Sequence, residues 1–219
     1  MKKEILAIIP ARKGSKRLPN KNNLKIGKYS LVEKSIKTAL KSKIINNIIV
    51  TSNDTKVLKL ENKFKNVNFI KRPNKLSNSK SKLTDVCNHA IQKLKKRFEY
   101  FILLQPTSPF RTNKHIDRAL NKVLKYKAEG LISISSTNNK EKNYFYIKKK
   151  YLSKITKNDN SKLKKFQFNG AIYVIKTNLL KRRNSFFIEG KILPFFMSNK
   201  QSIDIDYLSD FNKTKQLYK

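Results

Sequence analysis

The side chains best suited to chemistry near the N-terminus lie in a basic, glycine-containing loop. Residues 5–9 form an apolar run that predicts a buried strand, and Arg12, Gly14, Lys16 and Lys21 follow it. Glycine lets the backbone approach an anion, and the cations can neutralise phosphate charge. The spacing matches neither a Walker nor a dinucleotide-binding loop. A solvated basic turn is the plain alternative, but the position directly after a buried strand favours phosphate binding.

A second candidate is a pair of carboxylates near the C-terminus. Asp204 and Asp206 alternate with Ile203 and Ile205, in a chain that has only 14 acidic residues. On an extended segment this spacing turns both carboxylates to one side, where they could hold a hard cation such as Mg²⁺. A helix cap or ion pairs with the many lysines are the alternatives. Combined with the basic loop, the pair indicates metal-assisted phosphoryl or nucleotidyl transfer.

These residues need a scaffold, and the hydrophobic pattern predicts an α/β domain. Apolar runs indicate strands, and amphipathic stretches between them indicate helices, the first of which begins with Ser30 and Glu33 in capping-box spacing. The expected strands cover residues 5–9, 48–52, 67–70, 100–104, 131–135 and 171–175, and the expected helices residues 30–40, 55–65, 83–94 and 116–124. The proline-containing loop 105–112 follows a core strand, where ligands bind in this architecture.

Segment 137–168 has a weaker pattern. Short aromatic and aliphatic stretches at 144–147 and 151–155 alternate with lysine and asparagine, which is typical of a β-rich excursion. A segment with so little core of its own often packs on a partner subunit. We therefore expect one domain over residues 1–219 that contains this excursion.

Composition limits the possible partners and environments. The formal net charge is +37, so nucleic acid must be considered, but the lysines run from end to end, which favours a compositional bias over a nucleic-acid surface.

The single cysteine, Cys87, excludes an internal disulfide and a cysteine-based zinc cluster, and it lies on the apolar face of helix 83–94. His89 and His115 have no metal-ligand spacing and no detectable partner. No run reaches transmembrane length and no signal peptide is evident, so we expect a cytoplasmic protein.

Six motifs, in this order, resemble the acylneuraminate cytidylyltransferase family, whose enzymes make CMP-sialic acid and its relatives. They are IIPARKGSKRLP at 8–19 with KN at 21–22, RP at 72–73, LLQPTSPFR at 103–111, NGAIY at 169–173, FFI at 186–188 and SIDID at 202–206. The resemblance implies a mostly parallel central sheet flanked by helices, a Rossmann-like nucleotidyltransferase fold. It also implies a homodimer that exchanges segment 137–168.

The resemblance further implies a CTP- and Mg²⁺-dependent reaction in which the anomeric hydroxyl of a nine-carbon 2-keto sugar acid attacks the α-phosphorus of CTP. By position in the motifs, the implied catalytic residues are Arg12, Lys21 and Asp206, and the metal ligands are Asp204 and Asp206. The nucleotide would be bound by Ala11, Arg12, Gly14, Ser15, Lys16, Lys21, Asn22 and Arg72. The sugar would be bound by Gln105, Thr107, Asn169, Tyr173, Phe186 and Phe187.

The chain departs from the family pattern at three places. Residues 79–82 are Ser-Lys-Ser-Lys where relatives often have Asp-Thr and serines, Gln167-Phe168 replaces Arg-Pro, and Asn53-Asp54 replaces Asp-Asp. Altered substrate preference or reduced activity could follow. Two other functions stay open: CMP transfer to an eight-carbon 3-deoxy sugar acid, and non-catalytic nucleic-acid binding. The sequence does not distinguish neuraminic, legionaminic and pseudaminic acids.

Overall fold

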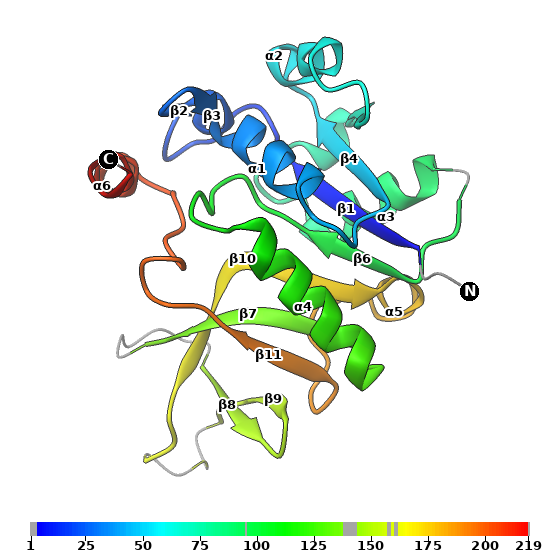
Figure 1. Cartoon of the computed structure of the whole chain (residues 1–219), viewed down its shortest axis with the longest axis vertical. Coiled ribbons are helices and arrows are strands. Elements are labelled where there is room, and N and C mark those ends of the chain that lie inside the picture. The colour runs from blue at the N-terminus through cyan, green and yellow to red at the C-terminus, as the bar shows by residue number, and fades with distance from the viewer. Residues whose placement is uncertain (1–3, 95, 138–143, 157–158, 160–161, 219) are drawn as a thin grey trace.

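A nine-stranded mixed sheet runs through the protein and carries helices on both faces in the computed structural model (Figure 1). The structure describes residues 4–94, 96–137, 144–156, 159 and 162–218. The strands are β1 Ile5–Pro10, β2 Lys25–Ile26, β3 Tyr29–Ser30, β4 Asn47–Ser52, β5 Asn68–Lys71, β6 Tyr100–Leu103, β7 Gly130–Ser136, β8 Phe145–Lys148, β9 Tyr151–Lys154, β10 Phe166–Lys176 and β11 Ile192–Phe196. The helices are α1 Leu31–Leu40, α2 Thr55–Leu58, α3 Leu83–Lys93, α4 Asn113–Tyr126, α5 Thr177–Arg183 and α6 Leu208–Leu217, with 3₁₀ turns at Lys21–Asn23, Lys59–Asn62 and Asn74–Leu76.

The order of the strands places the loops that form the site. The main path is β11-β7-β10-β6-β1-β4-β5, in which β6, β1, β4 and β5 pair in parallel. The chain moves from β1 to β4 on one side and later adds β6 on the other side of β1, so the strand order reverses between β1 and β6. Ligands in open α/β sheets bind at such a point, outside the carboxyl ends of the strands. The basic loop follows β1, and residues 104–112 follow β6.

Alternation along the central strand β1 builds two cores. Ile5, Ala7 and Ile9 face the cluster that includes residues of α1 and α4, whereas Leu6 and Ile8 face the cluster that includes residues of α3 and α5. All five side chains are essentially buried. Successive side chains of a strand point to opposite faces, so a continuous apolar run means helices on both sides. The prediction of a buried strand at residues 5–9 is confirmed.

Capping residues fix where two helices begin. The Ser30 hydroxyl accepts the Glu33 backbone N–H at 3.3 Å, and the Glu33 carboxylate accepts the Ser30 backbone N–H at 2.9 Å, as the spacing predicted. At α4 the Thr112 hydroxyl accepts the His115 N–H at 3.2 Å, and His115 Nδ1 accepts the Thr112 N–H at 3.2 Å. The expectation that His115 lacks a partner was therefore wrong. Histidine is not the usual third residue of a capping box, so this pair carries no recognisable capping motif.

Two elements differ in extent from the prediction. The last expected strand, 171–175, is the end of the 11-residue β10, which starts at Phe166 and runs antiparallel to β6 and β7. An irregularity between Phe168 and Tyr173, where Gly170 has a φ of +74°, separates its two halves. The expected helix 55–65 is only α2 followed by a 3₁₀ turn. The β11 strand and helices α5 and α6 were not predicted, because β11 contains a proline, α5 is short, and α6 lacks a clear apolar face.

The β-rich excursion contains the hairpin β8–β9, as predicted, and its apolar side chains pack on the core of the main sheet. Phe145 and Leu152 are 6% and 0% exposed and belong to the cluster on the α3 and α5 side of the sheet. Phe145 also stacks on Phe168 at 4.0 Å between ring centroids. Residues 138–143, 157–158 and 160–161 of segment 137–168 lie outside the described residues. Its exchange in a homodimer stays a prediction.

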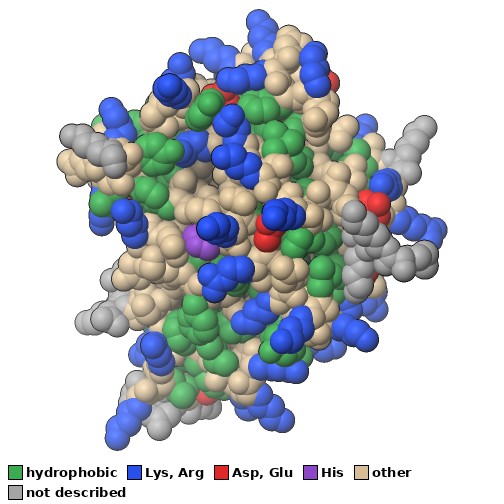
Figure 2. Space-filling model, viewed as in Figure 1, with side chains coloured by type: hydrophobic (Ala, Val, Ile, Leu, Met, Phe, Trp, Pro, Cys, Tyr) green, Lys and Arg blue, Asp and Glu red, His purple; other side chains and the backbone are tan. Residues whose placement is uncertain are grey.

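Basic side chains are numerous on the face of the molecule that Figure 2 shows. Lys and Arg spread across the whole face visible in Figure 2 and do not gather into one band. This distribution agrees with a compositional bias. Across the part of the chain that the structure describes, no helix combines the length and the apolar character needed to cross a bilayer.

Candidate active site

A cleft of about 430 Å³ opens between the loop after β1 and the loop after β6. It gathers residues from four separate stretches of the chain, most of them polar or charged. Its lining is Pro10, Arg12, Ser15, Lys16, Arg17, Lys21, Asn22, Arg72, Ser79, Leu83, Gln105, Pro106, Thr107 and Asp206. Nine of the residues predicted to bind nucleotide, sugar or metal are among them: Arg12, Ser15, Lys16, Lys21, Asn22, Arg72, Gln105, Thr107 and Asp206.

A small apolar cluster holds the two ends of the chain together beside this cleft. Leu18 of the basic loop packs with Ile205, Ile26 and Leu31, and Ile205 is completely buried. The Ile205 N–H also donates to the carbonyl of Thr107 at 2.9 Å. Burial of the isoleucine between two aspartates forces both carboxylates away from the cluster. The alternation of aspartate and isoleucine in the sequence therefore sets the direction of the two carboxylates.

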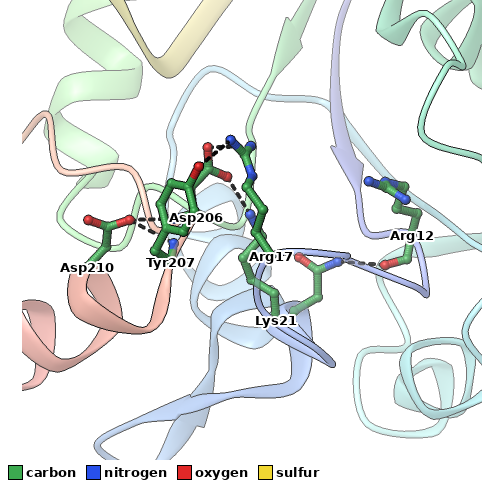
Figure 3. Close-up of polar contacts among 7 residues, drawn as sticks. Arg12, Arg17, Lys21, Asp206, Tyr207 and Asp210 are labelled. Atoms are coloured by element: carbon green, nitrogen blue, oxygen red, sulfur yellow. Dashed lines mark hydrogen bonds and ion pairs between the residues drawn. The ribbon is translucent and has the colours of Figure 1, made fainter.

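Asp206 faces the cleft and contacts two cations of the basic loop (Figure 3). Lys21 Nζ lies 2.7 Å from its Oδ1, and an Arg17 nitrogen lies 2.7 Å from its Oδ2. Arg17 also lies over the ring of Tyr207, 5.1 Å from the centroid. The hydrogen bond to Tyr207 and the charge of Asp206 raise the pKa of Arg17. Neither Arg17 nor Tyr207 was predicted as a site residue, because a loop with so many cations does not reveal which one meets a carboxylate.

Asp204 precedes Ile205 in the chain and is not among the residues that line the cleft; it lines a neighbouring hollow with Gln167 and Ser202. A Cβ placed on Gly170 would lie 3.5 Å from Asp204 Oδ2, so this glycine leaves room for the carboxylate. The Asp204 side chain is open to solvent on one side, yet crowding by protein atoms raises its pKa. Asp206 and Asp210 raise the pKa further, and a hydrogen bond with Thr107 opposes the shift.

Hydrogen bonds from side chains stabilise the backbone conformation of the basic loop. Gly14 has a φ of +76°, a conformation that favours glycine, and its carbonyl accepts a hydrogen bond from Arg12 at 3.0 Å. The Asn22 amide donates to the Arg12 carbonyl at 3.0 Å. The Lys13 N–H donates to the side-chain oxygen of Asn53 at 2.8 Å. Asn53, one of the departures from the family pattern, therefore supports the loop.

Ala11 and Arg72 are tied to the strand β4 beside the loop. The Ala11 N–H donates to the Thr51 carbonyl at 3.0 Å, and its own carbonyl accepts from Ser52 at 2.5 Å. Arg72 donates to the same Thr51 carbonyl at 2.6 Å. Burial, and to a lesser extent the neighbouring Arg12, lowers the pKa of Arg72 to about 10. Arg72 therefore brings a fixed positive charge to the cleft wall at neutral pH. Ser79, in the altered 79–82 stretch, also lines the cleft.

The loop after β6 is shaped by an arginine that the prediction did not assign to the site. Arg111 is 4% exposed and donates to the carbonyls of Gln105 at 3.0 Å and Ala171 at 2.8 Å, and to the Ser35 hydroxyl at 2.7 Å. Burial lowers the pKa of Arg111 to about 9. These bonds connect the loop to α1 and to β10. The Gln105 amide in turn donates to the Gly170 carbonyl at 3.2 Å.

Asn169 is a buried structural residue in this state of the protein. Its side-chain oxygen accepts from the Ser133 hydroxyl at 2.5 Å, and its amide nitrogen donates to the Ser202 hydroxyl at 2.8 Å. It is 6% exposed and lies outside the cleft lining. Asn169 therefore shapes the irregularity of β10 and ties it to the segment that carries the acidic pair. Its contact with the sugar stays a prediction.

Tyr173, Phe186 and Phe187 belong to an aromatic group beside Asp204 and outside the cleft lining. The rings of Tyr173 and Phe186 are 5.5 Å apart, and those of Phe145 and Phe187 are 4.9 Å apart. Burial and the charge of Asp204 raise the pKa of Tyr173 to about 12. Tyr173 is therefore the member of this aromatic group that lies within electrostatic range of Asp204.

The raised pKa of Asp204 has a consequence for stability. Because the folded-state pKa exceeds the ordinary value of 3.8, the folded protein binds this proton more tightly than the unfolded chain, so stability falls as pH rises through that interval. We expect metal-free Asp204→Asn to melt at a higher temperature than the wild type near neutral pH, and the difference to shrink towards pH 4 or so. Thermal melts with Glu61→Gln as an exposed carboxyl control measure this. A lower melting temperature for Asp204→Asn near neutral pH would contradict it.

The chain matches known proteins over nearly its whole length. A family model described as cytidylyltransferase matches residues 6–219. An N-acylneuraminate cytidylyltransferase of Escherichia coli O18:K1:H7 is 32% identical over 96% of this chain, which spans only 51% of that relative. A CMP-N,N'-diacetyllegionaminic acid synthase of Legionella pneumophila is 28% identical over 97% of this chain and 95% of the relative.

A solved structure has a fold similar to that of this chain. A CMP:2-keto-3-deoxy-manno-octonic acid synthetase complexed with CTP has a TM-score of 0.78 and 16% identity, with 98% of both chains covered. At this identity the likeness concerns the fold alone, and it confirms the expected nucleotidyltransferase architecture. The resemblance found in the six motifs is confirmed by the sequence relatives. The chain therefore belongs to the cytidylyltransferase family, alongside enzymes of N-acylneuraminic and legionaminic acid.

Proposed function

We propose that this protein transfers CMP from CTP to the anomeric hydroxyl of a nonulosonic acid and releases pyrophosphate. The observation that carries the proposal is the contact of Asp206 with Lys21, 2.7 Å apart across the cleft. It brings a carboxylate from the SIDID motif to the basic loop, so the acidic and the phosphate-binding halves form one site. The names of the relatives support this reaction, and we infer that this protein prefers sialic-type acids as substrates.

In this proposal the loop after β1 holds the triphosphate. Arg12, Lys16 and Lys21 line the cleft together with Ser15. Arg72 adds a further positive charge to the cleft wall. Such groups stabilise the charge that builds on the phosphates as pyrophosphate leaves, because they are already oriented before the reaction. Gln105 and Thr107 line the same cleft from the opposite loop and are suited to hydrogen bonds with sugar hydroxyls.

We further propose Mg²⁺ as the cofactor, bound by Asp204 and Asp206. Among the described residues there is no group of three or more His, Cys, Asp and Glu that could enclose a metal ion. Two carboxylates nevertheless fit Mg²⁺, which commonly takes one or two of them together with substrate phosphates and water. When bound, the ion would neutralise charge between the α-phosphate and the attacking hydroxyl.

Asp206 is the group proposed to accept the proton of the sugar. The anomeric oxygen forms a bond to the α-phosphorus, the bond from that phosphorus to the bridging oxygen of pyrophosphate breaks, and the hydroxyl proton passes to the Asp206 carboxylate. Lys21, at 12% exposure of its side chain, orients this carboxylate before the transfer.

Pyrophosphate release from CTP tests this function. We expect turnover with Mg²⁺ and one of N-acetylneuraminic, legionaminic or pseudaminic acid, and much less with an eight-carbon 3-deoxy sugar acid. Turnover of the eight-carbon acid alone would favour the alternative substrate class. No turnover with any acid, joined to tight and steeply salt-dependent binding of DNA or RNA, would favour a nucleic-acid-binding protein.

Homodimerisation and a cytoplasmic location are part of the same proposal. The β8–β9 hairpin within segment 137–168 and the exposed Phe196 of β11, 55% accessible, offer surface for a second copy. CTP is a cytoplasmic nucleotide, so a CTP-dependent enzyme is expected there. Light scattering measures the oligomeric state directly.

A further inference from the structure

Both carboxylate oxygens of Asp206 are occupied by protein cations. Lys21 and Arg17 each contact one oxygen at 2.7 Å. Each oxygen keeps a second lone pair, but a divalent ion bound there would lie close to both protein cations and be repelled by them. Departure of one of the two cations would therefore favour metal binding at Asp206.

Arg17 is the cation that can leave. Its side chain is 54% exposed, whereas that of Lys21 is only 12% exposed. Arg17 rests on Tyr207, which is itself 52% exposed, and its second contact, to the Tyr207 hydroxyl, is a long 3.5 Å. An exposed ion pair of this kind has a small net stability, so it exchanges readily.

Asp206 itself is held in place. The backbone N–H groups of Asp206 and Tyr207 donate to the Asp210 carboxylate at 3.0 and 2.8 Å, and Ile205 is buried on the other side (Figure 3). These contacts hold the backbone on both sides of the carboxylate, so movement of the exposed arginine is the simpler way to separate the pair.

The cleft provides a place for the released side chain. Arg17 lines the cleft with Arg12, Ser15 and Lys16, the residues proposed to hold the triphosphate. Phosphate oxygens accept two parallel hydrogen bonds from a guanidinium, which makes them stronger partners than a single carboxylate oxygen. The triphosphate would therefore compete with Asp206 for Arg17.

We propose that Arg17 is a positioning residue that keeps Asp206 closed to the metal until a nucleotide draws the arginine away. The inference rests on the proposed function only in taking Asp206 as a metal ligand. It gives the enzyme an order of binding, nucleotide first and the metal at Asp206 second. Tyr207 supports the closed state by carrying the guanidinium on its ring.

The test is Mn²⁺ binding to the nucleotide-free protein, followed by electron paramagnetic resonance. We expect Arg17→Ala to bind Mn²⁺ about two- to fivefold more tightly than the wild type, since an exposed ion pair no longer competes. Arg17→Lys should restore most of the competition. Arg182→Ala, an exposed arginine of α5, changes the net charge equally and should leave the affinity as in the wild type.

A double variant and a nucleotide measurement complete the test. The gain in Mn²⁺ affinity should vanish when Arg17→Ala is combined with Asp206→Asn. CTP binding in the presence of EDTA should be weaker in Arg17→Ala than in Arg182→Ala. An unchanged Mn²⁺ affinity, a gain that persists without Asp206, or unchanged CTP binding would overturn the proposal. None of these measurements needs turnover, so failure of the proposed reaction in the pyrophosphate assay is detected separately.

Discussion

Asp206→Asn is expected to lower kcat for pyrophosphate release by about 10³-fold, the scale on which a general base contributes. The amide cannot accept the sugar proton, and it is a poorer ligand for a hard cation than a carboxylate. It also loses the charge that pairs with Lys21 and Arg17. Steady-state assays with CTP and a nonulosonic acid give the value.

The control is Glu61→Gln, which neutralises an exposed carboxylate in the 3₁₀ turn Lys59–Asn62, away from the cleft. It should keep wild-type kcat. If Asp206→Asn also turns over within about threefold of the wild type, Asp206 is neither the base nor an essential ligand. Circular dichroism separates loss of chemistry from loss of folding, since Asp206 is an accessible residue whose replacement leaves the core intact.

Ile205→Ala is expected to destabilise the protein by about 2–5 kcal/mol, because it removes a completely buried side chain from a small cluster. The same change should reduce activity, since Ile205 packs on Leu18 and so joins the acidic pair to the basic loop. Urea unfolding gives the first effect and the pyrophosphate assay below the unfolding transition gives the second.

Ile203→Ala is the matched control for this prediction. Ile203 stands two residues earlier, is only half-buried and is outside the cluster, so its truncation should cost well under half as much. Equal destabilisation by the two variants would mean that the cluster does not anchor the segment. A stable Ile205→Ala protein with full activity would show that the aspartates are aimed by other contacts.

Much of the scaffold could be predicted from local pattern. The six expected strands are present, because a buried strand between two helical layers must be apolar along its whole length, as residues 5–9 are. The capping pair Ser30 and Glu33 fixed the start of α1 from spacing alone. Elements without a strong local pattern, such as β11 and α6, could not be found this way.

The site was predicted in part for a similar reason. Alternation of Asp204 and Asp206 with Ile205 predicts a buried isoleucine and two carboxylates on one side. Ile205 is buried, but only Asp206 lines the cleft, whereas Asp204 lines a neighbouring hollow. The role of Arg111 was not foreseen, because its partners are the carbonyls of Gln105 and Ala171, which are 6 and 60 residues away. Backbone carbonyls occur at every residue, so no sequence signal marks the two that a buried arginine needs.

The sequence by itself determined the kinds of groups available: a basic loop after a buried strand, a spaced pair of carboxylates, and the family to which they belong. Only the tertiary structure decided which groups meet. Arg17 and Lys21 reach Asp206 across 189 and 185 residues of chain because Leu18 and Ile205 share a core. Local spacing fixes the direction of a side chain, but contact between distant side chains depends on how the apolar faces pack, and that is a property of the whole fold.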